Sequence, residues 1–151
     1  MEYFHDGTGI IKYDPYRAGM KNRTTGWCVV NVDREVTRYY RYWINKHILN
    51  PLDLPNQGLC EPSWNAHISA CRGEHVSKDA QYLWKKYDNV RVDFEYSHNV
   101  FQPKNKPNFW CVEVKCAMID QIRAELNLKT FYSYHLTVGR TYNEFFQSTS
   151  L

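Results

Sequence analysis

The chain has 151 residues, a length typical of a single domain, and a net charge of only +3. Proteins that coat duplex DNA usually carry a concentrated basic patch, so this charge argues against duplex DNA as a partner and suits a small anionic ligand. The absence of a leader pattern, of a long apolar run and of CxxC spacing among the five cysteines predicts a cytoplasmic protein without a membrane segment or structural zinc.

The first half of the chain predicts strand, helix, strand. Residues 1–25 carry scattered glycine, Asp-Pro and Asn-Arg-Thr-Thr-Gly turn signals, so we expect an irregular arm with at most a short strand at 9–13. The β-branched run at 27–32 predicts a strand. Asp33 is a candidate cap for a helix over 34–49, on which Val36, Tyr40, Trp43, His47 and Ile48 recur at helical spacing, and Pro51 ends it.

The second half predicts the same order after a short insertion. Ser77 is a candidate cap for a short helix, and residues 90–96 alternate strictly between apolar and polar, as in a half-buried strand. A Pro- and Asn-rich loop at 97–108 precedes a strand at 110–116 and a helix on which Ile119, Ile122 and Leu126 share a face. We expect one domain over 1–151, with 141–151 as a tail.

One nine-residue pattern occurs twice. Residues 64–72 read WNAHISACR and residues 132–140 read YSYHLTVGR, so each copy has an aromatic residue, then His-x-Ser or His-x-Thr, and a final arginine. The tripeptide Trp-Cys-Val also begins both halves, at Trp27 and Trp110. The repeat therefore predicts two pseudo-symmetric β-α-β halves whose matching residues face each other.

Side chains along a strand alternate between its two faces, so His67 shares a face with Ser69, and His135 with Thr137. Two histidines and two hydroxyls suffice for phosphodiester chemistry without a metal or cofactor. A neutral imidazole accepts a proton and an imidazolium donates one, each worth about 10²–10⁴-fold in rate, while the hydroxyls donate to phosphate oxygens.

The two motif arginines pose a geometric problem. Arg72 and Arg140 follow their histidines by an odd number of residues, which puts them on the opposite face of an ideal strand. They reach the polar face only through a bulge or at the strand end.

Other interpretations remain open from the residues alone. A third His-x-Ser, at His75, lies in a predicted turn, and the two strand copies can be coincidental. A metal held by His67, His135 and Asp93 or Glu95 is chemically possible but lacks a metal-binding spacing. A Cys–His pair using Cys71 is a further alternative, and a non-catalytic nucleotide- or RNA-binding module would use the same histidines only to grip phosphate.

The two motifs, their strand setting and the order of elements from Trp27 to Arg140 resemble the 2H phosphoesterase superfamily. The resemblance implies an α+β, bilobal fold in which an antiparallel-rich sheet forms a central groove and helices lie outside. It implies metal-independent attack on a phosphodiester by an adjacent 2′-hydroxyl. His67 and His135 would be the acid–base pair, in an order that the motif does not decide, and Ser69 and Thr137 the phosphate ligands.

The segments NRTTGWCVV and HLTVGRTYN are similar to a bacteriophage branch, the anti-CBASS cyclic-oligonucleotide phosphodiesterases. That branch implies hydrolysis of 3′–5′ bonds in cyclic di- and trinucleotides such as 3′,3′-cGAMP, giving linear 3′-phosphate products and evading host defence in the bacterial cytoplasm. No obligate protein partner is evident. The alternatives within the fold are an RNA-end 2′,3′-cyclic phosphodiesterase and a 2′–5′ oligoadenylate phosphodiesterase.

The remaining candidate substrate contacts are Arg72 and Arg140, which follow the histidines. Three further candidates lie nearer the termini: Lys12, Tyr13 and Glu144. Aromatic residues make up 16% of the chain, and bases stack on aromatic rings. Tyr13 is the best candidate for stacking, whereas Trp64 and Tyr132 fall on the apolar face and are better assigned to the core. Glu144 or Lys12 would contact base edges.

Overall fold

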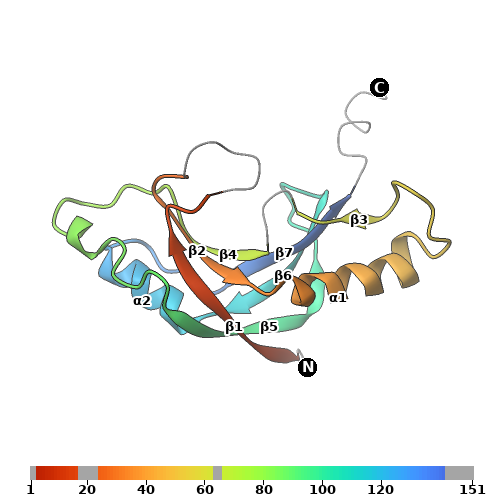
Figure 1. Ribbon diagram of the computed structural model, residues 1–151, viewed down its shortest axis with the longest axis horizontal. Helices are drawn as coiled ribbons and strands as arrows, with labels where there is room; N and C mark the ends of the chain where they lie inside the picture. Colours follow the sequence, from red (N-terminus) through yellow and green to blue (C-terminus); the bar gives the residue numbers. More distant parts are fainter. Residues whose placement is uncertain (1–2, 17–23, 63–65, 142–151) are drawn as a thin grey trace, which may run out of the picture.

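The computed structural model describes residues 3–16, 24–62 and 66–141, and their strands form one antiparallel sheet (Figure 1). The strand order is β3-β7-β4-β2-β1-β5-β6, and β7 also pairs with β6, so all strands except β3 close into a small six-stranded barrel. The strands are β1 (Phe4–Tyr13), β2 (Trp27–Val32), β3 (Leu59–Cys60), β4 (His67–Arg72), β5 (Arg91–Phe101), β6 (Phe109–Lys115) and β7 (Tyr134–Thr141).

In the described residues, two α-helices accompany the sheet and lie at opposite ends of the molecule (Figure 1). Helix α1 (Arg34–Ile44) continues into a π-helical turn (Asn45–Leu49) and packs on β7 and β3, whereas α2 (Ala117–Glu125) packs on β4 and β5. The expected α+β class is therefore confirmed. Within the described ranges, no helix combines the length and the apolar character needed to cross a membrane.

Both helices begin near the expected residue, but only part of the face expected to be apolar on α1 is buried. Asp33 caps α1 by accepting a hydrogen bond from the backbone N–H of Glu35. Trp43 and Ile48, expected to be buried, are about half exposed. The side chains that α1 does bury are Thr37, Tyr40, Arg41 and Ile44.

Helix α2 buries Ile119, Ile122 and Leu126, as the spacing predicts, together with Arg123. The short helix expected after Ser77 is only one 3₁₀ turn (Gln81–Leu83).

Strand β1 corrects the expectation of an irregular arm. It runs through the glycines that looked like turn signals and pairs with β2 on one side and β5 on the other. A Cβ on Gly7 would lie 2.7 Å from the Phe94 ring, and a Cβ on Gly9 would lie 2.5 Å from the Asn31 carbonyl oxygen. These glycines therefore permit close approach within the sheet, which is a second common reason for glycine in a strand.

The internal repeat is one strand longer than a β-α-β unit. Strands β1, β2 and β4 with α1 form the first half, and β5, β6 and β7 with α2 form the second. The halves join through two antiparallel pairings, β1 with β5 and β4 with β7. Trp27 pairs with Arg72 and Phe109 pairs with Arg140, so Trp27 corresponds to Phe109. The shared Trp-Cys-Val tripeptide is thus one residue out of structural register.

The long strands present an apolar face and an opposite face that carries most of their polar residues. Ile11, Val30, Val112 and Leu136 lie on the apolar face at 0% exposure and form the core with the helices. The polar face continues from strand to strand because directly paired residues point the same way in an antiparallel sheet.

We predict that Gly9→Ala lowers the free energy of unfolding by about 1–3 kcal/mol, because its Cβ would clash with the Asn31 carbonyl and the Val30 side chain. Chemical denaturation would measure the loss. Thr8→Ala is the matched control, since Thr8 is the exposed neighbour on the same strand. Equal stability of the two variants would contradict the close approach inferred at Gly9.

Candidate functional site

The two motif strands are neighbours in the sheet. β4 and β7 pair antiparallel at Ile68 and Leu136, which are both 0% exposed and occupy equivalent positions in the two motifs. This register places His67 beside Thr137, and places Ser69 beside His135. All four polar side chains therefore share the face opposite to the buried pair, as a compact two-by-two group related by the pseudo-two-fold axis.

A β-bulge occurs at the same position of each motif. In β4, Val29 pairs with Ser69 but Cys28 pairs with Cys71, so Ala70 is an extra residue. In β7, the pairings with β6 skip Val138 in the same way.

Each bulge resets the alternation of the strand. Arg72 and Arg140 therefore lie on the same face as the histidines, which an unbulged strand does not allow. On that face, Arg72 Nη2 lies 3.2 Å from His135 Nε2.

Two buried arginines donate hydrogen bonds to the extra residues of the bulges. Arg123 of α2 donates from Nη1 to the carbonyl of Ala70 at 2.8 Å, and Arg41 of α1 donates from Nη1 to the carbonyl of Val138 at 3.0 Å. Their exposed fractions are 2% and 9%. Each arginine thus reaches across to the bulge in the other half of the repeat.

A glutamate accompanies each buried arginine. Glu74, just after β4, accepts hydrogen bonds from Arg123 at 2.8 and 2.5 Å, and its Oε1 also accepts the backbone N–H of Arg72. Glu61, just after β3, lies 3.3 Å from Arg41 Nη2. The Arg123–Glu74 pair therefore links α2 directly to the backbone of the arginine beside His135.

The environment of His135 favours the neutral imidazole. Burial lowers its pKa to about 4, and the positive charges of Arg72, His67 and Lys106 act in the same direction. A guanidinium can only donate, so Nε2 of His135 is the acceptor of the Arg72 contact, and the neutral ring carries its proton on Nδ1. The His135 ring is therefore uncharged at neutral pH.

Further polar groups surround the histidines on the same face. The register places Asn31 beside His67, and Glu113 beside His135. Cys111 Sγ lies 3.6 Å from the Thr137 hydroxyl, and burial raises the pKa of this thiol. Each histidine thus has a polar residue beside it on the adjacent strand, and the positive charge of Lys106 also acts on His135.

Sequence reasoning missed Lys106, which lies in a loop, and the two buried arginines. Alignment of the two halves could have found Arg41 and Arg123, because they occupy matching positions in α1 and α2. Each directly follows a buried residue, Tyr40 or Ile122.

The structure corrects the expectation that Tyr13 stacks a base of the substrate. Tyr13 is only 3% exposed and packs edge-on against Trp84, with ring centroids 4.9 Å apart, so it belongs to the core and cannot stack a base. Lys12 instead contacts the Asn89 side chain. Tyr132, assigned to the core from its spacing, is 87% exposed. Trp64 and Glu144 lie outside the described residues.

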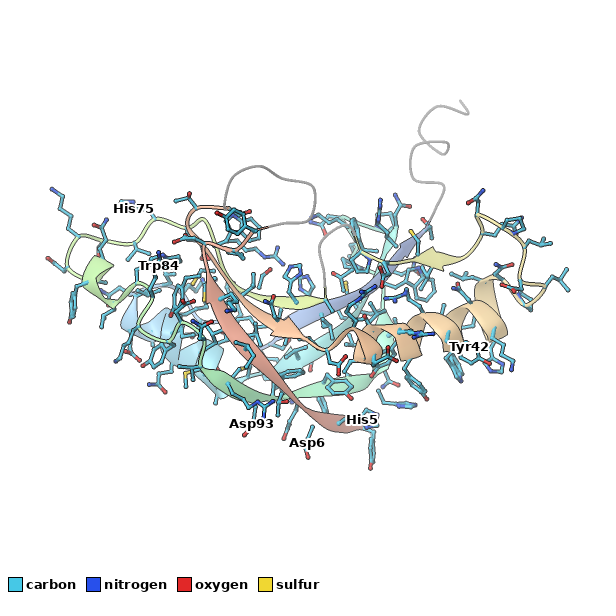
Figure 2. All side chains as sticks on the ribbon, viewed as in Figure 1. His5, Asp6, Tyr42, His75, Trp84 and Asp93 are labelled. Carbon is cyan, nitrogen blue, oxygen red and sulfur yellow. The ribbon has the colours of Figure 1, made fainter. Side chains whose placement is uncertain are left out.

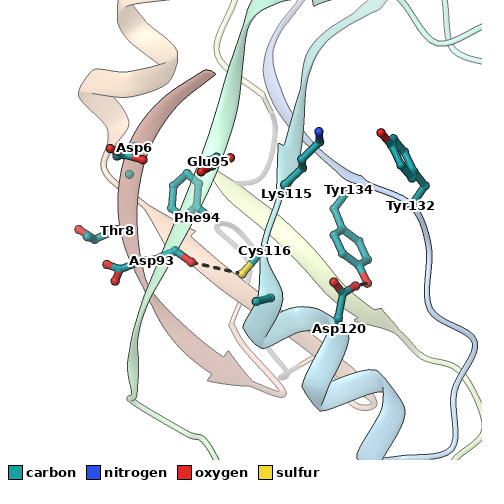
Figure 3. Close-up of a pocket in the computed structure, with 12 residues that line it drawn as sticks. Asp6, Thr8, Asp93, Phe94, Glu95, Lys115, Cys116, Asp120, Tyr132 and Tyr134 are labelled. Carbon is teal, nitrogen blue, oxygen red and sulfur yellow. Dashed lines mark hydrogen bonds between the residues drawn. The ribbon is translucent and has the colours of Figure 1, made fainter. Parts of the chain in front are cut away.

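The residues of the metal alternative are not brought together. Asp93 and Glu95 line a separate cavity of about 910 Å³ with Asp6 and Lys115 (Figure 3). Among the residues that the structure describes, no three His, Cys, Asp or Glu side chains are grouped closely enough to hold a metal ion.

The third His-x-Ser copy also lies apart from the motif pair. His75 is exposed beyond the end of β4, at the end of the molecule that carries α2 (Figure 2).

No protein-family model, no curated protein and no solved structure matches this chain.

We predict that Arg123→Met lowers the free energy of unfolding by about 3 kcal/mol, because the substitution removes the donor of the Ala70 carbonyl and leaves Glu74 with only the backbone N–H of Arg72. The value is at the lower end for a broken buried pair, since Glu74 is partly exposed and can regain water. Arg38→Met, on the exposed side of α1, is the control and should change stability little in the same denaturation experiment.

We predict that Arg72→Gln raises the pKa of His135 from about 4 toward its ordinary value of 6.5, because a positive charge beside Nε2 is removed. The value should stay below 6.5, since burial and the charges of His67 and Lys106 remain. NMR titration of the imidazole would measure it. Lys104→Gln, in the loop that carries Lys106, is the control, and an equal shift in both variants would contradict a specific effect of Arg72.

Proposed function

We propose that the protein is a metal-independent phosphodiesterase that cleaves 3′–5′ bonds of small cyclic oligonucleotides, such as 3′,3′-cGAMP. The observation that carries the proposal is the placement of His67, Ser69, His135 and Thr137 together on one face by the Ile68–Leu136 pairing. Two imidazoles and two hydroxyls in one group match the acid, base and phosphate donors that this reaction needs. Such an activity would remove the nucleotide signals of a bacterial antiviral defence.

The bilobal arrangement of the 2H phosphoesterases belongs to the same proposal. The two halves would be the lobes, and the polar face shared by β4 and β7 would be the floor of the groove between them. The pseudo-two-fold relation of the motifs and the packing of both helices on the apolar face support this arrangement.

In the proposed first step the 2′-hydroxyl next to the scissile phosphate attacks phosphorus. His135, neutral at pH 7, takes the 2′-hydroxyl proton as the new O–P bond forms. The bond from phosphorus to the 5′-oxygen breaks, and His67 in its protonated form gives that oxygen a proton. Water then opens the 2′,3′-cyclic phosphate to a linear product that ends in a 3′-phosphate, with the two histidines in exchanged roles.

The phosphate oxygens are assigned to the hydroxyls and the nearby cations. Ser69 and Thr137 donate to the non-bridging oxygens, where negative charge grows in the transition state. Arg72 lies in contact with His135, so an anion bound there would take over the guanidinium's hydrogen bond and release the His135 lone pair for the substrate proton. This exchange would raise the pKa of His135 on binding and make it a better base.

We predict that the purified protein converts 3′,3′-cGAMP to a linear dinucleotide in the presence of EDTA, and that His67→Ala and His135→Ala each reduce the rate at least 100-fold. Chromatography of the products measures both. His75→Ala is the matched control, because it removes the histidine of an identical His-x-Ser sequence that lies outside the motif strands, and it should keep full activity.

Two results would contradict the proposal. Loss of activity in EDTA with recovery on adding a divalent metal would replace the paired-histidine mechanism. No turnover of the cyclic dinucleotide, of 2′,3′-cyclic phosphate RNA ends or of 2′–5′ oligoadenylates, together with tight binding of any of them, would make the protein a nucleotide-binding module.

A further inference from the structure

A second cavity opens beside the His135 end of the motif group. It has a volume of about 380 Å³, within the range of small-molecule sites, and three of its lining residues are Ser69, Arg72 and His135. It extends away from them toward Phe131 and Ser133, which precede β7, and toward Glu74. A phosphate bound at the motif residues would therefore have room for one of its substituents in this cavity.

The Phe131 ring packs against a cationic and an aromatic neighbour. The Arg123 guanidinium lies 4.8 Å from the ring centroid, and the Tyr134 ring stands nearly perpendicular to it at 6.2 Å. Phe131 nevertheless remains 48% exposed, although an aromatic ring of this size normally seeks burial. An exposed ring that is already ordered loses little entropy when a planar group stacks on it.

The charged groups that line the cavity are Arg72, beside His135, and the Arg123–Glu74 ion pair, which lies near Phe131. Glu74 is negative and partly exposed, and its charge is paired with that of Arg123. Oε1 already accepts two hydrogen bonds, whereas Oε2 accepts one from Arg123, so Oε2 retains capacity for one more donor. Ser133 adds a hydroxyl. A carboxylate acceptor beside an aromatic ring suits the exocyclic amine of a nucleobase.

We propose that this cavity is a nucleobase subsite, in which the base of one nucleotide flanking the bound phosphate stacks on Phe131 and donates an amine hydrogen to Glu74. The assignment rests on the proposed function for the position of the phosphate. It also gives the site a direction along the substrate, because the nucleoside at the His135 end would contact the loop between α2 and β7.

Binding of adenosine 3′-monophosphate and of inorganic phosphate, each titrated calorimetrically, tests the subsite. The wild type should bind the nucleotide more tightly than phosphate. Phe131→Leu should weaken nucleotide binding about tenfold by loss of the stack, with phosphate binding unchanged, whereas Phe131→Trp should retain nucleotide affinity. Tyr82→Leu is the control, since Tyr82 is also an exposed aromatic residue but lies outside this cavity.

Equal nucleotide affinity in the wild type and Phe131→Leu would overturn the subsite, as would a wild type that binds the nucleotide no better than phosphate. The test does not depend on catalysis. A nucleotide affinity that exceeds the phosphate affinity in the wild type, and loses this advantage in Phe131→Leu, would establish the subsite even in a protein that fails to cleave 3′,3′-cGAMP. If the protein cleaves 3′,3′-cGAMP but its affinity for the nucleotide does not depend on Phe131, the phosphodiesterase proposal stands and the subsite is wrong.

Discussion

The antiparallel contact between Ile68 and Leu136 sets the geometry on which the rest of the candidate site depends. Both side chains are completely buried, so the core fixes the register between β4 and β7. A slip of one residue in either strand would turn the histidine of that strand into the core and expose its aliphatic side chain. Apolar burial on one face therefore positions the polar groups on the other.

The buried arginines extend this control along the strands. A bulge leaves an extra residue outside the regular ladder, and a buried carbonyl at that point needs a donor. Arg123 and Arg41 supply donors at Ala70 and Val138. Burying a guanidinium is costly, and the paired glutamates offset only part of that cost. The main effect of these pairs is positional, because a fixed bulge decides which face the next arginine occupies.

The features that the sequence predicts correctly depend on short-range patterns. The motif strands and the facing of their histidines follow from the two-residue period of a strand, and α2 follows from its apolar spacing. The bulges at Ala70 and Val138 cannot be recognised from that period, because each inserted residue is apolar, as the alternation itself predicts at that position. The core face of α1 was predicted only in part: Tyr40 is buried as expected, but Arg41 counts as a surface residue until its carbonyl partner is known.

Two other errors arise from long-range contacts. Gly9 looks like a turn residue until the neighbouring strand β2 is seen against it. Tyr13 looks available for stacking until Trp84, distant in the sequence, is seen to pack against it. Both depend on partners that no local window contains, and the cavity beside Phe131 likewise needs β4, α2 and the start of β7 together.

The crossed arginine contacts also describe how the two halves depend on each other. The helix of each half donates to the motif strand of the other, so neither half contains all the partners of its own buried groups. Two identical half-length chains related by a two-fold axis would exchange the same contacts, residue for residue, as in an isologous dimer. The single chain therefore carries the equivalent of a subunit interface inside its fold, and the candidate site lies across it.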